Sequence, residues 1–477
     1  MDVPLKVNNA SAVHFNSQSS PSAEASLAVK TKGGYPFIDK LTFHLPENLD
    51  IDQILQENPP QFNYCRDRFV YILNLIYTLP SRKKKNIEEY SGFTPISKKI
   101  LGSTIKDYRA YIKYLVEQNV VKEDKKYIPD IKCGGLRFTE AYGQTLYQKP
   151  IVITSWTLIK NITYLRKNYN KGQTQELLFL RKWFSELDVD IRGATKYLKR
   201  EYRKDKSLLV KYPELRYNSR LLPIAKLHTK EVPLFFVDNT AGRLHTYITQ
   251  LKSELRKFLT LKGKILHSID ISNSQPFLLQ CLLDKEVFDR CNMSEKLDRI
   301  QPELNTIMLG VLIESISQEE DVLQYKKIVS SGKFYGEFGA LLKENGELDN
   351  SLTGTDLKAC VKDITFASLF SKNKAIKYSK SIKIFERSFP NVYKVMKYVK
   401  KLDHSVLAVV LQNLEAEIVL NKTCKKIHSE NTDVRMYTLH DSIITTEENV
   451  EYVMNEMAKS LKACIGIEPN FKIEKWV

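Results

Sequence analysis

The sequence predicts an α+β fold divided among several domains, and three observations support that prediction. The chain has 477 residues, enough for about two to four domains with buried cores. From Arg66 onward, apolar residues recur at helical spacing. Residues 264–279 and 435–445 instead place β-branched and apolar runs around an aspartate, which is typical of strands. With 43% hydrophobic residues and 25 tyrosines, the composition excludes a globally disordered chain.

The formal net charge is +17, and a protein this basic usually meets a polyanion, most commonly nucleic acid. A generally lysine-rich composition is the alternative explanation. The seven cysteines stand singly, without a CxxC pair of zinc-ligand spacing, so we expect reduced thiols. No apolar run approaches the roughly 20 residues of a membrane helix, and the N-terminus lacks a signal-peptide pattern. We therefore expect a soluble protein without a membrane partner, in the cytoplasm or another reducing intracellular compartment.

Residues 1–58 are expected to form a flexible leader, because their first part is rich in Ser, Asn and Ala. A helix then begins at Arg66, where Phe69, Ile72, Leu73 and Ile76 share one stripe. Pro80 and the basic run after it are expected to interrupt this helix.

Residues 59–147 have the element order of a winged helix-turn-helix. A short helix runs through Leu101, and a second helix carries apolar residues at helical spacing up to Leu115. Two short strands follow, the second entered through Gly134-Gly135. Such a module often presents one helix to a DNA groove, and it also serves as a protein dock. The basic residues expected on the exposed face of the second helix are Lys106, Arg109 and Lys113.

Residues 148–235 are predicted to be mostly helical. The segment Ile191 to Lys206 interleaves Tyr197 and Tyr202 with six arginines and lysines between Arg192 and Lys204. Such a helix could grip a phosphate backbone, or it could be an ordinary solvated helix face, and the sequence favours neither.

Two acidic positions stand in strand contexts further along the chain. Asp270 follows a β-branched run and precedes a helix expected to start near Pro276. Asp441 lies with His440 between two apolar stretches, the pattern of a hairpin with a carboxylate at its tip. Two aspartates on neighbouring strands can bridge a pair of magnesium ions, which prefer hard oxygen ligands. A single strand-end aspartate, however, is more often a cap or turn residue.

Between these aspartates, residues 356–370 predict a helix with an unusual face. Lys358, Lys362, Phe366 and Phe370 recur every four residues and so project from one side. Two cations followed by two aromatics suit a nucleoside triphosphate, with lysines toward the phosphates and aromatics beneath base and sugar. A phenylalanine stripe at helical spacing is otherwise usually core.

Five blocks, in order, resemble the family-A polymerases, which include bacterial DNA polymerase I and single-subunit phage-type RNA polymerases. They cover about half of the chain, from Val237 to the C-terminus. The blocks are Thr240-Ala241-Gly242-Arg243-Leu244, Asp270 with Gln275, the helix from Lys358 to Phe370, Gln412 and its neighbours, and His440-Asp441. The sequence departs from the family pattern at Lys358, where arginine is usual, and at Phe370-Ser371, where Tyr-Gly is usual. The segment at roughly 284–330 is also longer than usual.

The resemblance implies a right-hand polymerase architecture. The palm would comprise residues 236–285 and 400–477, the fingers 286–399 and a thumb-like region 148–235, after the winged helix. Asp270 and Asp441, with the backbone carbonyl of Ile271, would hold two Mg²⁺ ions, with Mn²⁺ as the alternative ion. Lys362 would neutralise the triphosphate and protonate pyrophosphate. The groups implied to hold the DNA primer-template are Arg243, Gln412 and His440. A proofreading exonuclease needs a cluster of acidic residues, and the sequence ahead of the palm has none. We therefore expect no proofreading activity.

The motifs conflict on which sugar the enzyme would accept. DNA polymerases of this family usually have a glutamate at the position of Gln275, which is similar in length but uncharged. Phe366 resembles the DNA enzymes, whereas Ser442 after the aspartate resembles the RNA enzymes. We weigh the two pocket residues more heavily and expect a DNA polymerase, with an RNA polymerase or primase as the alternative. A non-catalytic DNA-binding replication factor on a decayed scaffold is the rival class.

Overall fold

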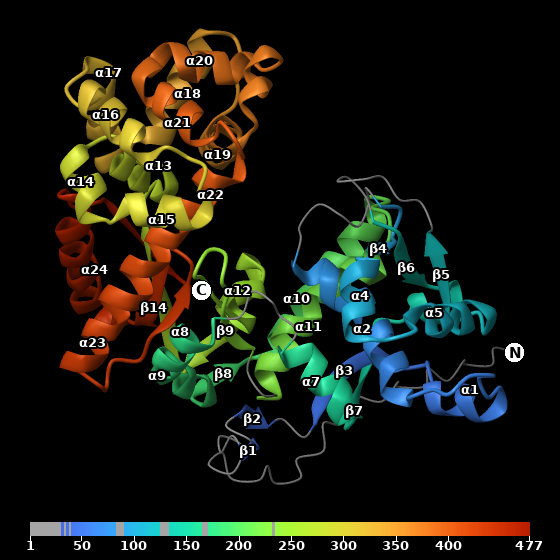
Figure 1. Cartoon of the computed structure of the whole chain (residues 1–477). Helices are drawn as coiled ribbons and strands as arrows, with labels where there is room; N and C mark the ends of the chain where they lie inside the picture. Colours follow the sequence, from blue (N-terminus) through green and yellow to red (C-terminus); the bar gives the residue numbers. More distant parts are fainter. Residues whose placement is uncertain are drawn as a thin grey trace, which may run out of the picture.

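The computed structural model describes residues 30–32, 35–37, 40–82, 90–124, 133–164, 170–230 and 234–477. It is a mixed α/β fold with three separate clusters of buried apolar residues. Figure 1 shows an N-terminal lobe, residues 41–164, on one side of helices α10 and α11. On the other side lie the central sheet, with β14 labelled, and a helical lobe, residues 285–399. The sheet and the helical lobe share one apolar cluster, so they are packed as one unit.

The N-terminal lobe contains two small antiparallel sheets, β3 with β7 and β4-β6-β5. A further hairpin, β1 (Lys30–Lys32) with β2 (Tyr35–Phe37), precedes it. The elements of the N-terminal lobe are β3 (Leu41–Pro46), α1 (Ile51–Glu57), α2 (Arg66–Arg82), β4 (Thr94–Pro95), α4 (Lys98–Thr104), α5 (Tyr108–Glu117), β5 (Val121–Asp124), β6 (Gly135–Phe138), α6 (Glu140–Gly143), β7 (Gln148–Ile153) and α7 (Trp156–Tyr164).

The expected boundaries of this lobe need correction at both ends. Residues 41–57, assigned to the leader, form β3 and α1, because Leu45, Leu49 and Ile51 are buried in the lobe's apolar cluster. At the other end, β7 pairs with β3 along its whole length, so the lobe continues beyond residue 147. The first 29 residues of the expected leader lie outside the described residues.

Within the lobe, the predicted helices and strands occur with two local differences. The stripe from Phe69 to Ile76 is buried, as helical spacing predicted. Pro80 does not end α2, which continues to Arg82 with the proline inside it. Lys106 lies in the turn before α5 and not on the helix, because Asp107 adopts a left-handed conformation (φ 62°) and α5 begins only at Tyr108.

Residues 170–258 connect the lobe to the sheet and are not wholly helical. β8 (Leu187–Val189) joins the central sheet, which corrects the expectation of a helical region over 148–235. The other elements are α8 (Lys171–Glu176), α9 (Leu178–Arg181), η1 (Lys182–Ser185), α10 (Ile191–Ser207), α11 (Pro213–His228), β9 (Phe235–Val237), β10 (Leu244–Thr246), α12 (Tyr247–Gln250) and η2 (Ser253–Phe258).

Helix α10 exposes its basic residues and uses its tyrosines internally. The Tyr202 hydroxyl donates to Glu214 Oε1 at 2.8 Å, and the Tyr197 ring lies 5.3 Å from the Arg200 guanidinium. The exposed basic residues are Arg192, Lys196, Arg200, Arg203, Lys204 and Lys206. Both tyrosines therefore make contacts within the protein, whereas most of the basic side chains are exposed to solvent.

The central sheet is antiparallel and has β12 (Lys264–Ile271) in its middle. β12 pairs with β11 (Leu259–Leu261), β14 (Ser442–Thr446) and β15 (Phe471–Lys475), and β14 pairs with β13 (Tyr437–Leu439). Successive residues of a strand face opposite sides of the sheet. Leu266 therefore lies in one apolar cluster and Ile269 in the other. Burial on both faces explains why apolar residues of this strand face either side of the sheet.

Helices cover one face of the sheet and build the helical lobe. They are α13 (Ser274–Leu278), η3 (Leu279–Leu282), α14 (Lys285–Arg290), α15 (Met293–Ile300), α16 (Thr306–Ile316), α17 (Glu320–Ser330), α18 (Phe334–Glu344), α19 (Gly354–Phe370), η4 (Asn373–Lys377), α20 (Lys380–Ser388), α21 (Pro390–Val399), α22 (Ser405–Ala416), η5 (Glu417–Cys424), α23 (Lys425–Glu430), η6 (Glu447–Asn449) and α24 (Val450–Ile465).

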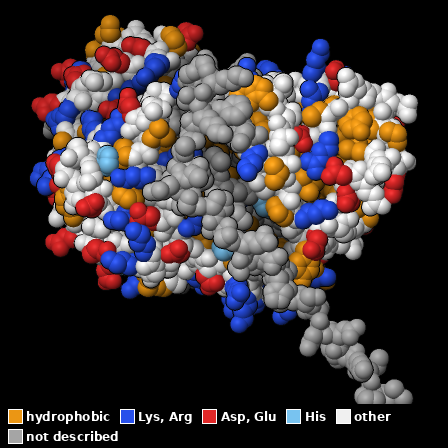
Figure 2. All heavy atoms as spheres, turned by 90° about the horizontal axis from the view of Figure 1, so that it is seen from below, with side chains coloured by type: hydrophobic (Ala, Val, Ile, Leu, Met, Phe, Trp, Pro, Cys, Tyr) orange, Lys and Arg blue, Asp and Glu red, His pale blue; other side chains and the backbone are white. Residues whose placement is uncertain are grey.

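The molecular surface carries both signs of charge. On the face shown in Figure 2, lysine and arginine side chains are interspersed with aspartates and glutamates. Over the described ranges, no helix is long and apolar enough to cross a membrane.

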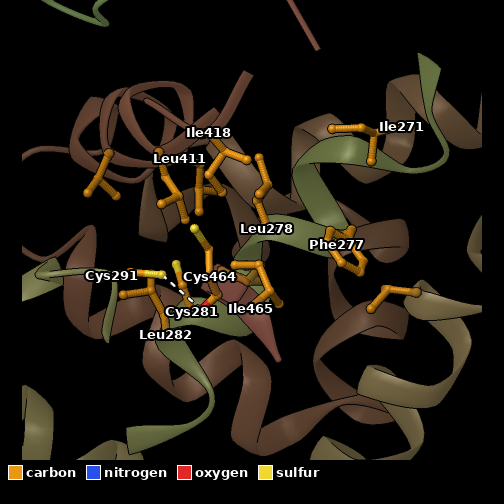
Figure 3. Packing of buried hydrophobic residues seen from close by; sticks show 14 of the residues in the cluster. Ile271, Phe277, Leu278, Cys281, Leu282, Cys291, Leu411, Ile418, Cys464 and Ile465 are labelled. Atoms are coloured by element: carbon orange, nitrogen blue, oxygen red, sulfur yellow. Dashed lines mark hydrogen bonds between the residues drawn. The ribbon is translucent and has the colours of Figure 1, made fainter. Parts of the chain in front are cut away.

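Four cysteines are buried in the apolar cluster that includes the end of β12. All seven cysteines lie within the described ranges, and each is a free thiol. Figure 3 shows Cys281, Cys291 and Cys464 grouped among leucines and isoleucines, where Cys291 Sγ donates to the Cys464 carbonyl at 3.5 Å. This packing joins the segment after β12 to α24.

Candidate active site

Asp270 and Asp441 lie side by side at one end of the central sheet. Asp270 is directly opposite Ser442 in the β12–β14 ladder, which puts Asp441 one residue from that pairing. Ser268 Oγ donates to Asp270 Oδ2 at 2.9 Å. Burial, together with the negative charges of Glu415 and Asp270, raises the pKa of Asp441 to about 7. The fold therefore concentrates negative charge at this sheet end.

A two-residue turn holds Asp441 at the hairpin tip. Leu439 pairs with Ser442, so only His440 and Asp441 connect β13 to β14. His440 takes a left-handed conformation (φ 56°), which histidine tolerates better than most residues and which two-residue hairpins require. Burial, reinforced by the positive charges of Arg243 and its neighbours, lowers the pKa of His440 to about 4. His440 is therefore neutral at physiological pH.

Glu415 on α22 is a third acidic residue of the site, which sequence reasoning missed. Its side chain is 2% exposed. Arg243 donates to Glu415 Oε1 through Nε at 3.0 Å and Nη2 at 2.6 Å. Gln275 Nε2 donates to Glu415 Oε2 at 2.6 Å, and Ser274 Oγ approaches the same oxygen at 3.3 Å. Glu415 thus joins two predicted site residues, Arg243 and Gln275. A charged residue within the apolar run of α22 was the available signal.

The loop that carries Arg243 is organised by Asp238. Asp238 Oδ1 accepts from the backbone N–H groups of Thr240 at 2.9 Å and Ala241 at 2.6 Å. His245 Nε2 lies 2.7 Å from Asp238 Oδ2. Burial acts to raise the pKa of Asp238, but these hydrogen bonds outweigh it and the pKa is lowered. The sequence indicated Arg243, but not the buried carboxylate that shapes its loop.

The same loop is fastened to α22. Asn413 Nδ2 donates to the Thr240 carbonyl at 2.8 Å. Gly242 has a φ of 67°, a conformation that favours glycine, and a Cβ at this position would lie 3.8 Å from the side chains of Ala416 and Asn413. Gln412 is half-buried on this helix, one position before Asn413. Two blocks far apart in the sequence, residues 240–244 and the segment around Gln412, therefore meet in space.

Helix α19 presents the predicted cation and aromatic face. Lys358 and Lys362 are exposed, whereas Phe366 and Phe370 are half-buried. Lys362 Nζ lies 5.6 Å from the centre of the Phe366 ring, and the two phenylalanine rings are 5.8 Å apart. An adjacent side of the helix is buried through Val361, Thr365, Ser368 and Leu369. α19 also packs against α22, so this face belongs to the same part of the molecule as Glu415.

Two further residues missed by sequence reasoning lie within electrostatic range of the aspartates. Tyr335, on α18, has its pKa raised by burial and by the charge of Asp441. Arg256, in η2, has its pKa lowered by burial, although the charges of Glu474 and Asp270 act to raise it. Neither residue belongs to a recognisable motif. Ile271 ends β12 opposite Phe471, and its carbonyl stays a predicted ligand.

The basic residues of the N-terminal lobe form a separate group. Lys106, Arg109 and Lys113 are exposed around the start of α5, and Lys113 Nζ approaches Glu117 at 3.6 Å. They belong to a different lobe from the aspartates, so any joint role would require a ligand that spans both.

The chemistry of the donor set fits a divalent cation. Asp270 and Asp441 offer hard carboxylate oxygens, which Mg²⁺ prefers. Burial, and then the negative charges of Glu415 and Asp270, raise the pKa of Asp441, and a bound cation would offset these charges. Within the ranges that the structure describes, no group of three or more His, Cys, Asp or Glu side chains is arranged to hold a metal ion.

Comparisons with known proteins give limited guidance. No protein-family model matches the sequence. No curated protein matches it either. Among solved structures, the chain is similar to the POL domain of Pol1 from M. smegmatis, described as a complex with DNA primer-template and dNTP. Identity is 9%, the TM-score is 0.38, and the match covers 67% of this chain and 73% of that chain. A TM-score this low supports no inference about fold or activity, so function has to be argued from the site.

Proposed function

We propose that the protein is a template-directed DNA polymerase that adds nucleotides to a primer 3′-hydroxyl. The observation that carries the proposal is the juxtaposition of Asp270 and Asp441 at one end of the sheet, where burial and then neighbouring negative charge raise the pKa of Asp441. The ordered resemblance of five blocks to family-A polymerases supports it. So does the convergence of two of those blocks, through Arg243 and α22, beside the aspartates.

In this proposal, the primer 3′-oxygen attacks the α-phosphorus of a nucleoside triphosphate, and the bond to the β-phosphate breaks. Asp270 and Asp441, with the Ile271 carbonyl, would hold Mg²⁺, which when bound stabilises the charge that develops on the transferring phosphoryl group. Lys362 would meet the triphosphate from α19 and give a proton to the departing pyrophosphate. Phe366 and Phe370 would lie beneath base and sugar, and Lys358 would meet the outer phosphates.

The remaining residues would position the nucleic acid. Arg243 would hold the primer end and Gln412 the duplex minor groove. His440 is neutral and its buried Nδ1 has no hydrogen-bond partner among the described residues, which suits a group that positions the primer terminus. The helix–turn–helix and ribbon order of the N-terminal lobe supports a winged-helix module that contacts DNA through Lys106, Arg109 and Lys113.

A rival function is a non-catalytic DNA-binding factor, and the N-terminal lobe favours it. A decayed site would have no reason to keep Asp441 buried beside Glu415 and Asp270, where the pKa of its carboxyl group is raised, so this costly arrangement supports catalysis.

A primer-extension assay tests the proposal. The protein is incubated with a primer-template, Mg²⁺ and either dNTPs or rNTPs, and product length and pyrophosphate release are measured. We expect extension dependent on the template, with dNTPs preferred. Tight DNA binding without extension by either nucleotide would favour the non-catalytic factor. Extension with a preference for rNTPs would assign the protein to RNA synthesis.

A further inference from the structure

We infer that Glu415 is a positioning residue for sugar selection: it fixes the orientation of the Gln275 side-chain amide beside the nucleotide site. The inference rests on the proposed function and deepens it. Glu415 would not touch the nucleotide itself but would act through Gln275.

The first observation is the set of groups that converge on Glu415. Both Arg243 hydrogen bonds go to Oε1, at 3.0 and 2.6 Å, while Gln275 and Ser274 approach Oε2. Arginine has donors only, so its two N–H groups on one oxygen require an acceptor there. Burial raises the pKa of Glu415, while the charge of Arg243 and the hydrogen bonds from Arg243, Ser274 and Gln275 act to lower it. The ion pair with Arg243 at 2.6 Å favours the ionised carboxylate, since a buried charge persists when it is paired and hydrogen-bonded.

The second observation is what this carboxylate does to Gln275. An ionised carboxylate only accepts, so the amide must turn its Nε2 toward Glu415, where the distance is 2.6 Å. Gln275 Oε1 then points away, and this buried oxygen has no hydrogen-bond partner within the described part of the chain. A rotated amide would place oxygen against oxygen. Glu415 thus holds Gln275 in a single orientation.

The third observation is where the pair lies. Gln275 is on α13, five residues beyond Asp270, and Glu415 is close enough to Asp441 to raise the pKa of that aspartate. α13 also packs against α22. The fixed amide therefore belongs to the wall of the candidate active site.

A fixed side chain discriminates better than a free one. A free glutamine amide could rotate, or swing aside, to accommodate a 2′-hydroxyl by donating or accepting a hydrogen bond. Anchored to a buried ion pair, it keeps its position and excludes the extra oxygen. Loss of the Glu415 charge should therefore weaken discrimination against ribose.

The test compares single-turnover incorporation of a dNTP and of the matching rNTP by the same enzyme preparation. The ratio of the two cancels losses of folded protein or of DNA affinity, which a merely structural role would cause. We expect Glu415→Gln to lower the preference for dNTP by roughly tenfold, and Gln275→Ala to lower it similarly. The double variant should show no further loss, because both changes release the same contact.

Two further variants make the test specific. The exchange Gln275→Glu with Glu415→Gln reverses the polarity of the hydrogen bond and should restore much of the preference. Glu417→Gln, on a glutamate that pairs with Lys296 and Lys422, should keep the parent ratio. If Glu415→Gln does not fold, Glu415→Asp, which is too short to keep the contact, should shift the ratio in the same direction.

The inference would be overturned if Glu415→Gln kept the parent ratio while Gln275→Ala changed it. A parent protein that extends no primer would overturn the proposed function, and the inference with it. Extension by the parent with an unchanged ratio in the Glu415 variants would overturn the inference alone.

Discussion

At the residue scale, ionisation of the buried Asp441 carboxyl group lowers the stability of the folded protein. Its pKa is raised from 3.8 to about 7 by burial and by the charges of Glu415 and Asp270. The folded state therefore binds a proton more tightly than the unfolded state, and stability falls as pH rises between these values. Above pH 7, where Asp441 is ionised in both states, the full loss of stability is present. Below pH 4 it is nearly absent.

Asp441→Asn should therefore stabilise the metal-free protein. One pKa unit corresponds to about 1.4 kcal/mol, so we expect a gain on the order of 2 kcal/mol in the free energy of unfolding at pH 8, and little gain at pH 4. Urea unfolding at both pH values measures it, with Asp289→Asn, on an exposed aspartate paired with Lys285, as the control. Added Mg²⁺ should stabilise the parent more than the variant. A variant less stable than the parent at pH 8 would contradict this account.

At the scale of elements, the sequence predicted those with strong periodicity or turn chemistry. The strand before Asp270, the hairpin at His440-Asp441 and the helix face from Lys358 to Phe370 all occur in the structure. The missed features depend on long-range contacts. Glu415 becomes part of the site only because α22 packs beside Gln275, which lies 140 positions earlier in the sequence. Likewise, β8 forms a strand because β11 pairs with it. Helical spacing likewise gave no sign that Lys106 precedes α5.

The basic group at α5 provides the prediction at this scale. Reversal of charge at Lys106, Arg109 and Lys113, all to glutamate in the full-length protein, should weaken binding to duplex DNA by at least about tenfold and flatten its salt dependence, because phosphate contacts release counterions. Gel-shift titrations at several salt concentrations measure both effects. The matched control reverses three exposed lysines elsewhere, Lys380, Lys459 and Lys462. Equal losses in both triple variants would indicate a general charge effect and not a DNA-binding helix.

At the scale of the whole molecule, α11 links the N-terminal lobe to the sheet. It packs against α2 and α10, and its Lys226 lies near His44 of β3. Burial, followed by the charge of Lys226, lowers the pKa of His44 to about 3. The unfolded state, in which histidine has its ordinary pKa of 6.5, binds more protons between these values. Stability is therefore lost as pH falls below 6.5.

We expect the parent to lose about 1 kcal/mol of unfolding free energy at this histidine between pH 7 and pH 5.5. His44→Gln, which cannot be protonated, should lose correspondingly less over the same interval. Denaturant unfolding at the two pH values provides the comparison, and His404→Gln, on an exposed histidine, is the control. Identical pH dependence in parent and His44→Gln would rule out this origin of acid sensitivity.

The most direct test of the central claim is single-turnover primer extension by Asp270→Asn and Asp441→Asn. Each variant is compared with the parent and with Asp289→Asn, and primer-template affinity is measured in parallel. If the two carboxylates hold the catalytic cations, both site variants should bind DNA nearly as the parent does but extend it at least about a thousandfold more slowly, because loss of a ligand removes several kcal/mol of transition-state stabilisation. Asp289→Asn should extend normally. Extension at close to the parent rate by either site variant would contradict the claim.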